Sequence, residues 1–231
     1  MSRRLLLTAF AVATIAAPAA ADEPPTTGGA VAPPSPPTEG VISAEGGQVT
    51  LSARAGSMHG RIARFRGSAP AGRAVAVERL DAATGAWTVL ARTTAAADGA
   101  YSVSWRTSGL GPHRVRAVLD RDGSAAAAIT APELGITVHR PAMATWYGPG
   151  FYGRRTACGQ RMSPTLNGVA HKTLPCGTKV SLLYRGRRLT VPVVDRGPYT
   201  AGKHWDLTAA TATALRFTHT DRVGAVQVQS R

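Results

Sequence analysis

Residues 179–199 read KVSLLYRGRRLTVPVVDRGPY, in which two apolar runs flank a tight basic turn. Short runs rich in Val, Leu and Thr that are bounded by glycine or proline are typical of β-strands. We therefore predict strands at 179–184 and 189–194, joined by a turn at 185–187. The second strand ends at Asp195, a carboxylate that enters a Gly-Pro turn.

The residues around this hairpin predict a small all-β unit. An aromatic and glycine-rich segment occupies 146–153, and an alternating run at 223–228 would be a closing strand. Residues 209–217 have a helical composition, and Thr208 is a suitable N-cap. Six or so short strands with one or two small helices predict a compact barrel for 141–231.

Residues 41–140 have a different rhythm, with short alternating runs separated by turn residues. In one of these runs Val49, Leu51 and Ala53 are apolar and their neighbours are polar. Alternation with period two marks a half-buried strand, and strands spaced by about ten residues are typical of a β-sandwich. Because the rhythm resembles that of immunoglobulin-like domains of bacterial surface proteins, we predict an immunoglobulin-like β-sandwich at 41–140.

The N-terminus has the three-part layout of a secretory signal peptide. Two arginines precede an apolar run at 5–17, and small residues lead to Ala21. We predict a signal peptide at 1–21 and a semi-rigid, proline-rich linker at 22–40; an uncleaved membrane anchor is the alternative. Export predicts a secreted or cell-envelope protein with no stable membrane insertion after cleavage.

The charge of the chain restricts its partners. The 231 residues include 27 Lys or Arg and 13 Asp or Glu, which gives a formal net charge of +14. Such an excess attracts polyanions. Because the signal peptide predicts export, we expect anionic cell-wall polymers as partners and no nucleic acid. The hydrophobic share of 44% does not fit a multi-pass membrane protein.

Acid–base chemistry in 141–231 has few residues to draw on. The segment contains Asp195, Asp206 and Asp221 and no glutamate. At the end of an apolar strand, desolvation would favour the protonated form of Asp195 that a general acid needs, and Arg196 would oppose this if it points the same way. In the plainer interpretation Asp206 starts a turn or helix, and Asp221 is a surface residue.

Five separated motifs in 141–231 resemble the rare lipoprotein A (RlpA) family of double-psi β-barrels, to which the barrels of expansins are related. The motifs are ATWYG at 144–148, GRRTA at 153–157, AHKTLPCGT at 170–178, DRGP at 195–198 and DLT at 206–208. The resemblance implies a mainly β chain that ends in a six-stranded double-psi β-barrel with short helices. It does not extend to the first 140 residues.

The resemblance also implies a lytic transglycosylase, which cleaves the β-1,4 bond between N-acetylmuramic acid and N-acetylglucosamine in peptidoglycan and leaves a 1,6-anhydro end. An ordinary glycosidase needs two carboxylates, whereas here the sugar's own 6-hydroxyl attacks, so one acid suffices. The resemblance gives this role to Asp195, with His171 beside it, and we expect no cofactor and no metal. The residues expected to contact the glycan strand are Gln160, Tyr147, Trp146, Asp206, Tyr199 and Trp205.

One departure from the family pattern supports a second hypothesis. Gln160 stands where the family commonly has a glutamate, and a glutamine cannot titrate. If that glutamate contributes to catalysis, this barrel would bind and loosen wall polysaccharide without cutting it. The alternative function is therefore a non-catalytic, expansin-like wall-binding protein.

Cys158 and Cys176 are the two cysteines of the chain. In an exported protein an isolated pair is most simply a disulfide. A metal site that also uses His171, or two free thiols, are the alternatives. A disulfide would hold the segment that carries Gln160 against the strand that follows His171.

Overall fold

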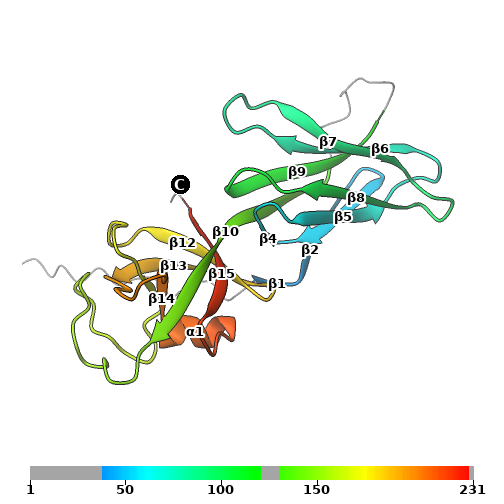
Figure 1. The fold of residues 1–231 in the computed structure, drawn as a ribbon. Helices are drawn as coiled ribbons and strands as arrows, with labels where there is room; N and C mark the ends of the chain where they lie inside the picture. Colours follow the sequence, from blue (N-terminus) through cyan, green and yellow to red (C-terminus); the bar gives the residue numbers. More distant parts are fainter. Residues whose placement is uncertain (1–37, 121–130, 229–231) are drawn as a thin grey trace, which may run out of the picture. The chain divides into compact units, whose positions relative to one another are not determined.

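The computed structural model describes residues 38–120 and 131–228, which consist mainly of strands (Figure 1). The predicted signal peptide and residues 22–37 of the predicted linker lie outside the described residues. The elements are β1 Thr38–Glu39, β2 Val41–Gly46, β3 Val49–Arg54, β4 Gly56–Met58, β5 Ile62–Ser68, β6 Ala74–Leu80, β7 Trp87–Thr94, β8 Ala100–Arg106, β9 Gly111–Leu119, β10 Glu133–Tyr147, β11 Val169–Ala170, β12 Lys179–Tyr184, β13 Arg187–Asp195, β14 Trp205–Thr208, α1 Ala209–Leu215 and β15 Asp221–Gln227.

Two sheets share an apolar core in the first part of the described chain. One sheet has the strand order β2-β3-β5-β8. In the other, β7, β6 and β9 lie side by side and continue into the first half of β10, which also pairs with β4. Leu51, Phe65, Val77 and Val115 are fully buried in the core that both sheets supply. The immunoglobulin-like character of this part stays a prediction.

Strand β10 contributes to two cores. Residues 133–138 pair with β9, and 140–147 pair with β15 and β14. The predicted domain boundary at 140/141 therefore falls inside one continuous strand. Pro141 has no N–H to donate to a sheet, so the sequence alone favours a break there, but in the structure this residue lies opposite Gly224 of β15.

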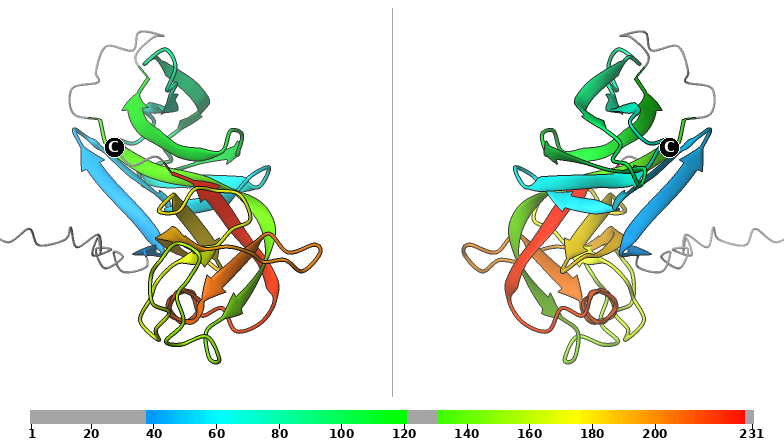
Figure 2. Two further views of the ribbon diagram at one scale, coloured as in Figure 1. Left: turned by 90° about the vertical axis from the view of Figure 1, so that its left-hand side faces the viewer. Right: turned by 90° about the vertical axis from the view of Figure 1, so that its right-hand side faces the viewer.

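Six strands close into a barrel in the last part of the chain. Their order is β10-β14-β11-β13-β12-β15, and the ring closes because β10 pairs with both β14 and β15. Figure 2 shows these strands, coloured from green through yellow to red, from two opposite sides. Leu182, Val191, Leu207 and Val223 are fully buried in the barrel core. The prediction of an all-β fold with a C-terminal six-stranded barrel is confirmed.

The local features of the barrel follow the sequence closely. Strands β12 and β13 form the predicted antiparallel hairpin. Thr208 caps α1, because its side chain accepts the backbone N–H of Thr211. One difference concerns the predicted linker 22–40, whose residues Thr38–Glu39 form β1 and pair with β13. Among the described residues, no helix combines the length and the apolar character needed to cross a membrane.

Candidate active site

Asp195 is the last residue of β13, and three hydrogen bonds hold its carboxylate. Its Oδ1 accepts the backbone N–H groups of Ala157 and Arg196, both at 2.8 Å. Its Oδ2 accepts the hydroxyl of Tyr147 at 3.1 Å. The chain leaves the strand through Gly197, whose φ of 122° favours glycine. The half-buried carboxylate is therefore oriented from both oxygens at the end of a rigid strand.

Tyr147 is the last residue of β10 and donates the hydrogen bond that Asp195 accepts. Burial raises the pKa of this phenol well above its ordinary value, and the negative charges of Asp195 and Asp206 raise it further. The phenol therefore keeps its proton under physiological conditions. Its ring meets that of Phe151 edge-on, with 5.7 Å between the ring centroids, which adds to the fixed position of the hydroxyl.

Asp206 is on β14 and Asp195 is on β13, and the short strand β11 lies between these two strands. Ala170 of β11 pairs with Asp195 on one side and with Asp206 on the other. Both residues therefore lie beside Ala170, although the register between β11 and β13 shifts between Val169 and Ala170. The negative charges of both aspartates raise the pKa of Tyr147, so the two carboxylates lie near the same phenol.

The environment of Asp206 differs from that of a solvated carboxylate. Burial raises the pKa of Asp206, a 2.7 Å hydrogen bond donated by Thr145 partly offsets this, and the charge of Asp195 adds to the increase. The helix that follows is capped by Thr208. The plainer interpretation of Asp206, as a carboxylate that starts the helix, therefore does not describe its hydrogen bonding.

His171 follows β11 directly and has a defined tautomer. Its Nδ1 accepts the backbone N–H groups of Thr173 at 3.2 Å and Leu174 at 3.1 Å. An Nδ1 that accepts two donors cannot carry a proton, so the neutral ring bears its hydrogen on Nε2. Burial lowers the pKa of His171, and the nearby charge of Arg196 lowers it further. The imidazole can therefore donate one hydrogen bond from Nε2 to a substrate oxygen.

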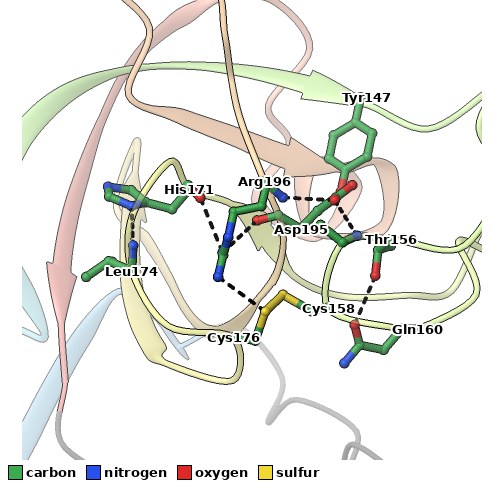
Figure 3. The surroundings of a disulfide bond; sticks show 10 residues. Tyr147, Thr156, Cys158, Gln160, His171, Leu174, Cys176, Asp195 and Arg196 are labelled. Carbon is green, nitrogen blue, oxygen red and sulfur yellow. Dashed lines mark hydrogen bonds between the residues drawn. A yellow bond between two sulfur atoms is a disulfide. The ribbon is translucent and has the colours of Figure 1, made fainter.

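Arg196 does not pair with the carboxylate beside it. Its guanidinium donates to the backbone carbonyls of His171 and Asp195, both at 3.4 Å, and to the sulfur of Cys176 at 3.4 Å (Figure 3). Only its backbone N–H contacts the carboxylate of Asp195. The guanidinium thus ties the segment after β11 to the end of β13 and leaves the Asp195 oxygens to other donors.

The predicted disulfide between Cys158 and Cys176 is present, with 5.6 Å between the two Cα atoms. It links the loop that carries Ala157 to the segment between His171 and β12 (Figure 3). Since the N–H of Ala157 is a donor to Asp195, the disulfide restrains one of the groups that orient the carboxylate.

Gln160 belongs to the same loop but binds backbone rather than Asp195. Its amide lies 3.0 Å from the hydroxyl of Thr156. With its nitrogen turned toward the barrel, the amide donates to the carbonyl of Val194 at 3.3 Å and to that of Cys158 at 3.2 Å. A carboxylate could not donate to these two carbonyls, so the local structure explains a glutamine here.

The predicted aromatic residues divide among three environments. Trp205 is only 8% exposed, and its ring lies 4.4 Å from that of His171. It lines, with Leu174, a hollow of about 310 Å³. Tyr199 is 82% exposed. Trp146 points to the opposite face of β10 from Tyr147 and lines a separate hollow of about 380 Å³ beside α1. Trp146 is therefore not part of the group around Asp195.

Two members of the site were not identified from the sequence. Thr145 binds Asp206, and the backbone of Ala157 binds Asp195. Thr145 and Tyr147 are two residues apart on one strand and share a face, so the alternation could have indicated Thr145. Nothing in the sequence indicates the Ala157 contact, because it depends on how a loop folds over the barrel. Within 38–120 and 131–228, no three His, Cys, Asp or Glu side chains gather as metal ligands would.

Comparisons with known proteins agree with this geometry. A family model described as "Lytic transglycolase" matches residues 140–230. The probable endolytic peptidoglycan transglycosylase RlpA of Synechocystis is 46% identical over 86 residues, which cover 36% of this chain and 26% of the relative. The protein of the same name from Aquifex aeolicus is 49% identical over 74 residues, 31% of this chain and 33% of the relative. The endolytic peptidoglycan transglycosylase RlpA of Campylobacter jejuni is 41% identical over 75 residues, 32% of this chain and 27% of the relative.

The family model thus covers the barrel, and the chain spans a quarter to a third of the length of each of these relatives. Within that part the identity is high, and the closed six-stranded ring agrees with the fold that the motifs imply. Residues 140–230 are an RlpA-like double-psi β-barrel.

Proposed function

We propose that the barrel cuts the glycan strands of peptidoglycan as a lytic transglycosylase, with Asp195 as its acid and base. The observation that carries the proposal is the half-buried carboxylate of Asp195, oriented by Tyr147 and Ala157 at the end of β13. The relatives that match this barrel are named for the same activity.

The proposed reaction uses one residue twice. Asp195 as a carboxylic acid gives its proton to the glycosidic oxygen, and the bond from C1 of N-acetylmuramic acid to that oxygen breaks. The 6-hydroxyl of the same sugar then bonds to C1 and closes the 1,6-anhydro ring. The hydroxyl proton passes to the Asp195 carboxylate, which restores the acid. No water is consumed, so the reaction needs no second carboxylate to activate one.

The surrounding groups support this reaction in different ways. Tyr147 keeps its proton and donates it in a hydrogen bond to one oxygen of the Asp195 carboxylate. This hydrogen bond fixes the orientation of the carboxylate toward the substrate. His171 supplies an Nε2–H for a sugar oxygen or an amide carbonyl. Asp206 is a second carboxylate close enough to Asp195 for their charges to interact, and it is suited to accept hydrogen bonds from sugar hydroxyls.

Sugar contacts beyond the reacting bond have two candidate places. The hollow lined by Trp205 and Leu174 adjoins His171 and offers an apolar wall. Tyr199 is exposed four residues after Asp195 and can stack on a sugar face. Neither hollow described above is lined by Asp195, so the proposed sugar contacts lie beside the reacting bond rather than around it.

A non-catalytic, expansin-like function is the second candidate, and Gln160 favours it. Its amide is engaged with the backbone carbonyls of Val194 and Cys158 and cannot titrate, so it supplies no proton. In that case the same surface would bind wall polysaccharide and leave every glycosidic bond intact. Peptidoglycan and a cell-envelope location belong to both candidates, and anionic wall polymers as a further partner rest on the net charge of +14.

Product analysis separates the two functions. The purified chain is incubated with glycan strands stripped of peptide, and the products are identified by mass spectrometry. We expect 1,6-anhydro ends, with a rate that falls by about 10²–10⁴-fold in Asp195→Asn. The matched control is Asp221→Asn, which should keep the rate. The carboxylate of Asp221 accepts the hydroxyl of Tyr184 and lies away from the site.

Three results would argue against the enzyme. Binding to sacculi without any product would support the expansin-like candidate. Reducing ends in place of anhydro ends would indicate hydrolysis and would make Asp206 a second catalytic carboxylate. Equal rates in Asp195→Asn and the unchanged chain would show that a residue other than Asp195 is the acid.

A further inference from the structure

The two sheets at 41–138 differ in how their arginines are paired. In the sheet that contains β7, β6 and β9, each of three arginines has its own carboxylate. Arg92 binds Asp120 at 2.6 Å, Arg116 binds Glu78 at 2.7 Å, and Arg114 binds Glu133. These cations are neutralised within the protein.

The outer face of the sheet β2-β3-β5-β8 has the opposite character. Arg54 on β3 and Arg64 and Arg66 on β5 are exposed, while Phe65 between them is fully buried, so the three guanidinium groups share the outer face. Within the described residues none of the three makes an ion pair or a side-chain hydrogen bond. Glu45, the one described carboxylate on the outer face of these strands, lies opposite Thr50 on the edge strand, away from them.

The sheet register concentrates this charge. Arg66 lies opposite Ser52, and continuing the antiparallel register brings Arg64 beside Arg54. Like charges placed opposite each other on neighbouring strands disfavour the sheet. Three exposed and unpaired guanidinium groups on one face are therefore available to an external anion, whereas Arg92, Arg114 and Arg116 are already paired.

The three guanidinium groups also line a hollow. It measures about 270 Å³, and its wall includes Ser52 and Ser57 together with Val41 and Ile62. The serine hydroxyls can donate further hydrogen bonds to an anion. The exposed side chains of Val41 and Ile62, 65% and 44% accessible, can cover the carbon atoms that join one anionic group to the next.

We infer that this Arg54–Arg64–Arg66 face binds a polyol-phosphate polymer, which is a flexible phosphodiester chain without bases. A phosphodiester carries its charge on two non-bridging oxygens of a tetrahedral group, which can accept guanidinium donors from more than one direction, whereas the acceptors of a carboxylate lie in one plane. A concave site suits a chain of separate anionic groups better than it suits the flat surface of a membrane. The face belongs to the part of the chain that the RlpA-like match does not cover, so it adds a polymer-binding function to the proposed chemistry of the barrel.

Binding of fluorescent poly(glycerol phosphate) to the full chain tests this inference at low and moderate salt. The variant Arg54→Gln/Arg64→Gln/Arg66→Gln should weaken binding by about tenfold or more, because three charge-assisted contacts are lost. The matched control is Arg73→Gln/Arg92→Gln/Arg114→Gln, which removes the same net charge from exposed positions and should change the affinity by about twofold at most. If the triple variant is not folded by circular dichroism, Arg64→Gln alone is compared with Arg73→Gln.

Equal losses in both triple variants would overturn the inference, because they would show attraction by net charge alone. Tighter binding of polygalacturonate, of anionic phospholipid vesicles or of duplex DNA at equal charge concentration would also overturn it and would name a carboxylate polymer, a membrane or a nucleic acid instead. Binding is measured without turnover, and Asp195→Asn should bind like the unchanged chain. A failure of the proposed enzyme activity therefore leaves this test intact.

Discussion

The phenol of Tyr147 and the carboxylate of Asp195 join the ends of two strands that are not neighbours in the barrel. Their 3.1 Å hydrogen bond connects β10 with β13, although β14 and β11 lie between these strands in the ring. The contact thus crosses the end of the barrel. It makes the position of the proposed acid depend on two distant parts of the chain.

Replacing Tyr147 by phenylalanine removes this contact and retains the ring. A hydrogen bond to a charged group contributes about 1.5–3 kcal/mol, so the cleavage rate should fall by about tenfold to hundredfold if the bond acts in the transition state. Tyr152→Phe, at an exposed tyrosine of the following loop, is the control and should keep its rate. Equal rates for both variants would show that the phenol does not position Asp195.

The raised pKa of Asp206 predicts a pH-dependent effect on stability. An unfolded aspartate titrates near 3.8 and the folded Asp206 titrates higher, so the folded state is favoured at low pH and loses this advantage as the pH rises through that window. Asp206→Asn should therefore raise the melting temperature at pH 7 and leave it unchanged well below pH 3.8, where the acid is protonated in both states.

Asp221→Asn should behave in the opposite way. The backbone N–H of Arg222 and the hydroxyl of Tyr184 lower the pKa of Asp221, so its contribution to folding is present at pH 7 and is lost in acid. We expect a small decrease in melting temperature at pH 7, because the group is exposed. Melting curves of both variants across the acid range check the two signs, and a loss of stability in Asp206→Asn at pH 7 would contradict the burial argument.

Gln160→Glu tests whether the glutamine is structural. The carboxylate cannot donate to the carbonyls of Val194 and Cys158, so the variant should lose about 1–3 kcal/mol of unfolding free energy at pH 7. Gln48→Glu, in the exposed turn between β2 and β3, adds the same charge and should cost less than about 0.5 kcal/mol. Denaturant unfolding of both variants measures the difference.

The cleavage activity of Gln160→Glu is a second measurement on this variant. If the family's glutamate takes part in catalysis, Gln160→Glu should raise the yield of 1,6-anhydro ends despite its lower stability. Unchanged cleavage with lower stability would confine Gln160 to a structural role.

Reduction of the disulfide should affect the barrel and not the other core. Closing a loop of this length contributes about 3 kcal/mol in the chain-entropy picture. Hydrogen exchange on the full chain, followed by mass spectrometry with and without reductant, should show faster exchange around β11 and β13. Faster exchange in β5 or β8 would contradict the prediction, because neither cysteine contacts that core.

Local patterns were sufficient to predict much of this barrel. Apolar runs bounded by glycine gave the hairpin at 179–184 and 189–194, and the hydroxyl of Thr208 caps the helix as its position indicates. The disulfide was predictable because two cysteines in an exported chain have few other uses. In each case the cause lies within a few residues or in the chemistry of one residue type.

Contacts set by the closure of the ring could not be predicted in the same way. The placement of Asp195 and Asp206 on either side of Ala170 depends on the order of three strands, and the donor at Ala157 depends on a loop. Trp146 and Tyr147 are both candidates for sugar contacts because they are aromatic, and the sequence alone does not show that they face different surroundings. In a strand, adjacent residues point to opposite faces, and the structure places them accordingly.

The bond between Cys158 and Cys176 also bears on when the site can mature. Until the two thiols are oxidised, the loop that carries the Ala157 N–H lacks its covalent link to the segment after His171, so its hydrogen bond to Asp195 is less restrained. If the chain is exported as its sequence predicts, oxidation would complete the proposed active site only after the chain has left the cytosol.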